Sequence, residues 1–156
     1  MQPCRLFGLF FLVIFSAESR ARHPLPADWI IHHPELQDTR KNRIKKTPTD
    51  CTLEIAQLDD ATLPTPRGTI LLLPGLFHNA NVFDLLPEQK VSYARYLSRE
   101  LGLRVYVLNF RGSGQSCRLS RSNLDDLAID DIPTALRFIT QKEGSKIYVL
   151  GQSQGG

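Results

Sequence analysis

The stretch that decides the fold is IYVLGQSQGG, residues 147–156. Its first four residues are apolar and are typical of a short buried strand, and G-x-S-x-G follows them directly. A serine between a strand and a helix lies in a sharply turned, strained backbone, and small residues on both sides relieve the crowding. Because Gly151 and Gly155 flank Ser153 in this way, the stretch predicts a nucleophilic serine at a strand-to-helix turn.

Two further apolar runs, at residues 70–73 and 105–108, precede this turn. Each is four residues long and nearly free of polar side chains, which is typical of strands covered on both faces of a parallel sheet. Residues 50–58 instead alternate apolar and polar side chains. We therefore expect a fourth strand there, at an exposed edge of the sheet.

The intervals between the apolar runs have the spacing of amphipathic helices. In the first interval, Pro87 suits the start of a helix and Gly102 its end, with apolar residues every three to four positions between them. In the second, Ser122 can cap a helical turn, and we expect Pro133 to begin a helix that ends at Gly144. The alternation of strands and helices predicts an α/β fold with a mainly parallel sheet and flanking helices.

Ligands of open parallel sheets bind beyond the carboxyl ends of the strands, where all three apolar runs here enter glycine-bearing turns. PGLFH follows the first run (residues 74–78), and NFRGSGQS follows the second (residues 109–116). They resemble the His-Gly-x oxyanion loop and the D-x-R-G-x-G-x-S segment of α/β-hydrolases. Residues 49–156 thus resemble the N-terminal half of that fold, truncated after the nucleophile turn. Within the family, DIP at residues 131–133 and the GQSQGG turn are most similar to acid-lipase-like serine esterases and lipases.

The resemblance implies a serine hydrolase that transfers the acyl group of a carboxylic ester to Ser153, without a metal or cofactor. It implies a small-molecule ester or lipid substrate with an apolar acyl group. It also implies that the backbone N–H groups of Leu76 and Gln154 hold the oxyanion. Pro74 and Gln152 stand where such motifs often have histidine, which bears on the substrate more than on the reaction. Cleavage of a peptide or thioester is an alternative chemistry.

In this fold the acid and the histidine of the catalytic triad follow the nucleophile, and neither residue type follows Ser153 in this sequence. We therefore expect the chain as given to be truncated, to aggregate on its own and to lack turnover that depends on Ser153. His78 would lie at the same edge of the sheet, where a hydrogen-bonding or surface role is favoured over that of a substitute base. A second interpretation is a non-catalytic fragment or pseudoenzyme that acts as a binding or regulatory module.

The N-terminal third differs in charge from the rest. Residues 1–48 carry eight Lys or Arg against four Asp or Glu, whereas residues 49–156 carry eleven against twelve. Arg5, a mostly apolar run and then small residues resemble a secretory signal peptide over residues 1–21, which predicts export. Residues 22–48, with their prolines and charges, predict a polar and basic linker. We expect no nucleic-acid binding, and at most peripheral contact with a lipid surface.

Three other groups of residues could serve either a structural or a functional role. Cys51 and Cys117 could pair in an oxidising compartment, but the sequence does not give their distance. The four aspartates within residues 125–131 suit helix starts better than a cation site. Arg111 suits a hydrogen-bonding role in its own loop better than the binding of an anionic substrate.

Overall fold

The computed structural model describes residues 25–36, 51–60, 65–75, 78–85, 92–118, 122–144 and 146–156. Four expectations lie wholly or mostly outside the described residues. They are the signal peptide, most of the linker, the oxyanion donor Leu76 and the helix start Pro87. Within the described ranges, no helix is both long and apolar enough to cross a membrane.

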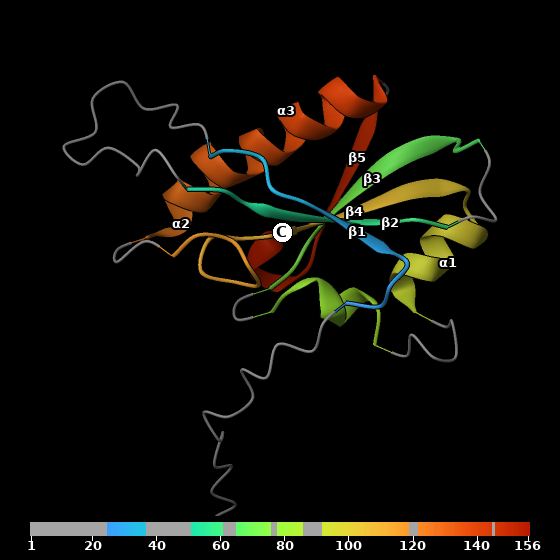
Figure 1. Ribbon diagram of the computed structural model, residues 1–156, viewed down its shortest axis with the longest axis horizontal. Helices are drawn as coiled ribbons and strands as arrows, with labels where there is room; N and C mark the ends of the chain where they lie inside the picture. The colour runs from blue at the N-terminus through green and yellow to red at the C-terminus, as the bar shows by residue number, and fades with distance from the viewer. Residues whose placement is uncertain are drawn as a thin grey trace, which may run out of the picture.

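A mixed sheet forms the centre of the fold (Figure 1). Within the described ranges it has five strands in the order β1-β2-β4-β3-β5. The strands are β1 (Trp29–His32), β2 (Glu54–Leu58), β3 (Gly68–Leu73), β4 (Leu103–Asn109) and β5 (Ile147–Gly151). β3 runs parallel to β4 and to β5, whereas β2 is antiparallel to both β1 and β4. The three predicted apolar strands are therefore the parallel part of the sheet, and the predicted α/β fold is confirmed.

One edge of the sheet differs from the edge that the sequence predicts. β2, expected at an edge, is buried along its whole length because β1 pairs with it. Residues 29–32, which composition places in a linker, form that extra strand, and Trp29 is buried opposite Leu58. β5 lies at the other edge of the described sheet, and Tyr148 and Val149 are half exposed there although the strand has the apolar composition of a buried one.

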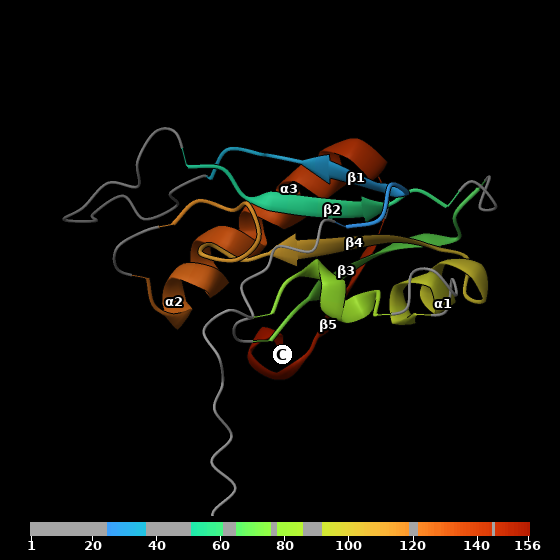
Figure 2. The ribbon, with the colours of Figure 1, turned by 60° about the horizontal axis from the view of Figure 1, so that its bottom comes forward.

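Helices cover both faces of the sheet (Figures 1 and 2). The helical elements are η2 (Ala80–Phe83), α1 (Tyr93–Arg99), α2 (Leu124–Asp126), η4 (Leu127–Asp131), α3 (Ile132–Glu143) and η5 (Ser153–Gly155). Because successive side chains of a strand point to opposite faces, β4 contributes to two cores. Val105 and Val107 pack with Ala94 of α1 on one face, while Tyr106 packs with Ala135 of α3 on the other.

The helix that precedes β5 starts differently from the prediction. Its cap is Asn123 rather than Ser122: the Asn123 side chain accepts the N–H of Asp126, and the Asp126 carboxylate accepts the N–H of Asn123, each at 3.0 Å. This reciprocal pair is a capping box. Pro133 lies in the first turn of α3 but does not begin the helical stretch, because the π-helical turn η4 leads directly into it. Such a widened turn accommodates the missing N–H of proline and the clash of its ring with the preceding turn.

A buried cluster of hydrogen bonds attaches β1 to the rest of the fold. Arg95 of α1 donates from Nε and Nη2 to the two carboxylate oxygens of Asp84 at 2.9 and 2.8 Å, and it also pairs with Asp28 before β1. The indole N–H of Trp29 donates to Asp84 at 2.8 Å. Burial acts to raise the pKa of Asp84. The hydrogen bonds from Arg95 and Trp29 outweigh this effect, so the pKa lies below its usual value.

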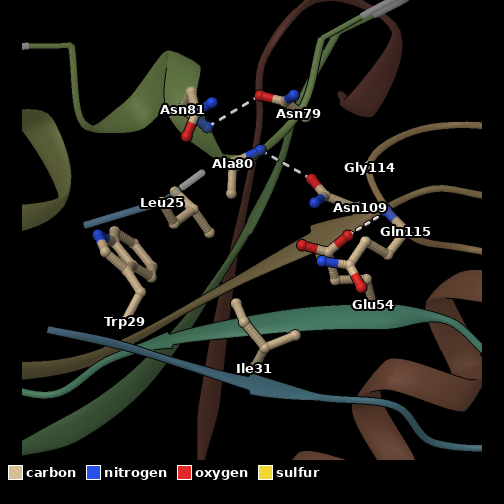
Figure 3. A pocket seen from close by; sticks show the side chains of 10 residues that line it. All are labelled: Leu25, Trp29, Ile31, Glu54, Asn79, Ala80, Asn81, Asn109, Gly114 and Gln115. Carbon is tan, nitrogen blue, oxygen red and sulfur yellow. Dashed lines mark hydrogen bonds between the residues drawn. The ribbon is translucent and has the colours of Figure 1, made fainter. Parts of the chain in front are cut away.

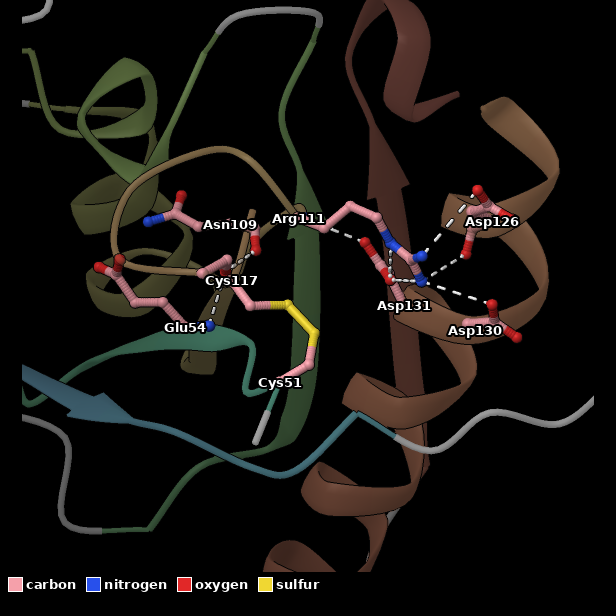
Figure 4. Close-up of a disulfide and its surroundings, with 9 residues drawn as sticks. Cys51, Glu54, Asn109, Arg111, Cys117, Asp126, Asp130 and Asp131 are labelled. Atoms are coloured by element: carbon pink, nitrogen blue, oxygen red, sulfur yellow. Dashed lines mark hydrogen bonds and ion pairs between the residues drawn. A yellow bond between two sulfur atoms is a disulfide. The ribbon is translucent and has the colours of Figure 1, made fainter. Parts of the chain in front are cut away.

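A disulfide joins Cys51, just before β2, to Cys117, at the end of the turn that follows β4 (Figure 4). The two Cα atoms are 5.2 Å apart, and the cysteines are separated by 66 residues in the sequence. In the chain-entropy account, a loop of that length makes the disulfide worth about 4 kcal/mol of stability. The pairing that the sequence leaves open is thus present, and it fastens the NFRGSGQS turn to the sheet.

Candidate active site

β5 leads Ser153 into a tight turn at the carboxyl end of the parallel strands (Figures 1 and 2). Ser153 has a φ of 56°, and among the described residues it is the one non-glycine residue with positive φ. L-residues reach this region only at a cost, and such strained residues cluster at functional sites. Its side chain is exposed, as an attacking nucleophile requires. The backbone geometry predicted from G-x-S-x-G is therefore present.

The glycines on either side of the serine are required by close backbone packing. A Cβ on Gly151 would lie 2.0 Å from the carbonyl oxygen of Gly155, and a Cβ on Gly155 would lie 2.3 Å from the carbonyl oxygen of Leu73. Real Cβ contacts essentially never fall below 3.0 Å. Because the neighbours are backbone atoms that cannot swing away, any side chain at either position would displace the turn and Ser153 with it.

The loop after β3 packs directly against the serine. A Cβ on Gly75 would lie 3.1 Å from Cβ of Ser153 and 3.3 Å from Nδ1 of His78. Gln152 fastens this loop, since its N–H donates to the carbonyl of Leu73 at 3.0 Å and its side-chain oxygen accepts the N–H of Gly75 at 3.2 Å. From the sequence, Gln152 is only a departure from the family pattern. In the structure it holds the first loop against the nucleophile.

The expected oxyanion donors lie in these two segments. Gln154 follows Ser153 in η5 and is half-buried, so its N–H belongs to the same turn as the nucleophile. Leu76 is outside the described residues, but Gly75, directly before it, is buried against Ser153. His78 is exposed, and no hydrogen bond between described residues joins it to Ser153. Its backbone N–H donates to the carbonyl of Gly75 at 3.1 Å, which is a loop-ordering role.

The turn after β4 supports the first loop from the other side. The hydroxyl of Ser113 donates to the backbone carbonyl of His78 at 2.6 Å. The side-chain oxygen of Asn109 accepts the N–H of Ala80, the first residue of η2, at 2.7 Å (Figure 3). All three predicted glycine-bearing turns therefore meet at one edge of the sheet and are joined by hydrogen bonds.

Arg111 anchors the turn after β4 to the helical layer (Figure 4). Its Nε and Nη2 donate to one carboxylate oxygen of Asp131 at 2.8 and 2.5 Å, and its backbone N–H donates to the other at 3.0 Å. Asp130 lies 3.4 Å and Asp126 4.0 Å from the guanidinium. Burial raises the pKa of Asp131 despite the hydrogen bonds from Arg111.

This geometry supports the structural role predicted for Arg111, because its side chain is buried and directed at the aspartates. The aspartates in turn belong to helix starts and to this ion cluster. Within the described part of the chain, no group of His, Cys, Asp and Glu residues is arranged to hold a metal ion.

The sequence model of the α/β-hydrolase fold family matches residues 68–156, which include β3, β4, β5 and the serine turn. The chain therefore belongs to the α/β-hydrolase fold family. No curated protein matches the sequence at a significant level.

Two solved structures are similar to this chain to different degrees. A serine hydrolase of this fold without a lid, from Xanthomonas campestris, superimposes with a TM-score of 0.55 at 19% identity, covering 83% of this chain and 53% of its own. A predicted CIB-like hydrolase from Thermoplasma acidophilum gives a TM-score of 0.41 at 15% identity, covering 81% of this chain and 53% of its own. The chain thus spans about half the length of these structures.

Proposed function

We propose that the protein is a serine hydrolase that cleaves carboxylic esters through an acyl-enzyme on Ser153. The observation that carries this proposal is the φ of 56° at Ser153, in a turn whose flanking glycines pack against backbone atoms. A serine that only filled a surface turn would have no need of this strain. Membership of the hydrolase fold family supports the same chemistry.

In the proposed reaction, Oγ of Ser153 attacks the ester carbonyl carbon, and its proton passes to a general base. In this fold that base is a histidine placed after the nucleophile in chain order. The negative oxygen that forms is held by the N–H groups of Gln154 and Leu76. Collapse of the tetrahedral species expels the alcohol with the proton from the base. Water then attacks the acyl-enzyme in the same way and releases the acid.

We propose an apolar acyl group for the substrate and an exported location for the protein. The first rests on the resemblance to lipases and esterases. The second rests on the signal-like residues 1–21, and the disulfide between Cys51 and Cys117 supports it, because such bonds persist in oxidising compartments.

A panel of p-nitrophenyl esters with acyl chains from acetyl to decanoyl tests this function in the full-length protein. We expect kcat/KM to rise with chain length by up to about fourfold for each methylene that becomes buried. The matched thioesters and p-nitroanilides should be poorer substrates than the esters. Faster cleavage of the anilide or the thioester, or a preference for the acetyl ester, would contradict the proposed substrate class.

A further inference from the structure

A small cavity lies beside the candidate active site, between η2 and the strands β1, β2 and β4 (Figure 3). Its volume is about 190 Å³, and Ser153 is not among the described residues that line it. One wall is apolar and is formed by Leu25, Trp29 and Ile31. The serine turn is therefore not part of the described lining of the cavity.

The opposite wall carries two buried polar side chains, Glu54 and Asn109, which are only 5% and 2% exposed. Because the Asn109 oxygen accepts the N–H of Ala80, its amide nitrogen is the end that faces the cavity. One oxygen of Glu54 accepts the N–H of Gln115, and the other is directed into the cavity (Figure 3). The cavity therefore presents a fixed donor beside a carboxylate.

Glu54 differs from the other buried carboxylates in the described part of the chain. Those four all lie in the clusters around Arg95 and Arg111. Within the described residues, no Lys, Arg or His forms an ion pair with Glu54. Buried charges in proteins are normally paired. A negative charge without a protein cation thus lies at the wall of a cavity of molecular size.

The backbone at Gly114 allows Glu54 and Asn109 to lie close to the turn after β4. Gly114 has a φ of 53°, and a Cβ there would lie 2.3 Å from the Glu54 carboxylate and 2.5 Å from the amide nitrogen of Asn109. Glycine therefore allows the turn after β4 to close over both side chains. The N–H of Glu54 is also held, by the hydroxyl of Ser116 at 2.7 Å. The two polar groups are thus fixed in position.

We propose that this cavity binds a small organic cation, a protonated primary amine with a compact apolar group. The ammonium pairs with Glu54, and the apolar group lies against Trp29 and Ile31. The amide nitrogen of Asn109 donates to an acceptor atom on the ligand where one is present. The inference does not depend on Ser153 as a nucleophile, because none of these residues takes part in the proposed acyl transfer.

Binding can be followed at Trp29 itself in the full-length protein. 5-Fluorotryptophan is incorporated, and the ¹⁹F resonance of Trp29 is assigned by its loss in Trp29→Phe. Cyclohexylammonium is the probe, and cyclohexanol is the neutral control of matched size and shape. We expect a saturable shift of the Trp29 resonance with cyclohexylammonium and an apparent Kd at least about tenfold weaker for cyclohexanol, because hydrogen bonds to charged groups are the stronger ones.

Glu54→Gln keeps the shape and one acceptor oxygen but removes the charge. This substitution should weaken the binding of cyclohexylammonium at least about tenfold and leave the Kd of cyclohexanol unchanged. Glu100→Gln, at an exposed position after α1, is the matched control and should behave as wild type. Equal affinity for the two probes, or an unaltered response in Glu54→Gln, would overturn the proposal in favour of purely apolar binding. Absence of any saturable shift would overturn it in favour of a water-filled cavity. The comparison of the two probes is made on protein with Glu54 intact and needs a variant, Trp29→Phe, only to assign the resonance.

Discussion

Replacing Ser153 with alanine should lower kcat for ester hydrolysis by the full-length protein at least about 10³-fold. The nucleophile itself is lost, so only the binding and oxyanion groups remain to assist attack by water. The protein should still fold, because alanine keeps the Cβ and bears the same φ of 56° that serine already bears. We expect the free energy of unfolding to change by less than about 0.5 kcal/mol, as for other exposed positions.

The matched control for this prediction is Ser122→Ala. Ser122 is also exposed, but it lies just before α2 and is not part of the serine turn. It should retain wild-type kcat and KM. Near-normal turnover by Ser153→Ala, measured on protein purified free of host esterases, would rule out Ser153 as the nucleophile. Equal losses in both variants would point to an effect on folding instead.

Replacing Arg111 with methionine should lower the free energy of unfolding at pH 7 by about 3–5 kcal/mol. Methionine fills much of the same space, so the main effect is the loss of the cation. Asp130 and Asp131 are both 0% exposed, and Asp131 accepts three hydrogen bonds from Arg111. One of these comes from the backbone and survives the substitution. Asp131 would be left buried without the Arg111 cation, which costs more than the ion pair itself contributes.

The same variant should recover part of its stability in acid. The pKa of Asp131 is already raised by burial, and loss of the Arg111 side chain removes hydrogen bonds that lower it. A carboxyl group with a raised folded-state pKa binds its proton more tightly in the native state, so stability increases as the pH falls through that pKa. Denaturant unfolding at pH 7 and pH 5 should therefore show a smaller deficit at pH 5.

Arg99→Met is the control for this second prediction. Arg99 is exposed, and its Nε lies 3.4 Å from Asp60. The Arg99 side chain is 34% exposed, so solvent screens its pairing with Asp60, and the loss should be clearly smaller than in Arg111→Met, about 1 kcal/mol. A deficit in Arg111→Met as small as that in Arg99→Met would show that the buried cluster does not hold the turn after β4.

The parallel strands could be predicted because each is a short apolar run. Residues 70–73, 105–108 and 147–150 all lie within β3, β4 and β5, and strands covered on both faces tolerate few polar side chains. The order of the strands within the sheet was harder to predict from the sequence. β5 has apolar residues like a central strand, yet it pairs only with β3 among the described residues.

β1 could not be predicted from local sequence. It has only three apolar residues within a polar segment, and its position depends on distant partners. Arg95, 67 residues from Asp28, holds the start of the strand through that carboxylate and through Asp84. The local sequence does not reveal a contact with so distant a residue, so the composition of this segment predicts a linker.

The candidate site divides in the same way. The strained Ser153 and its two glycines follow from the motif, since the turn itself demands them. The role of Gln152 depends on the loop after β3, which no local pattern connects to it. The helix cap at Asn123 could have been predicted from the sequence. Asn123 and Asp126 have the three-residue spacing of a capping box, and asparagine is as good a cap as serine.

The central claim, that Ser153 is the nucleophile, is tested most directly by an active-site fluorophosphonate followed by peptide mass mapping of the full-length protein. Such a probe bonds covalently to the activated oxygen and leaves ordinary serines untouched. We predict one adduct per chain, located on Ser153, whose formation is blocked when an ester substrate competes. An adduct on another serine, or hydrolysis that persists without any adduct on Ser153, would contradict the account.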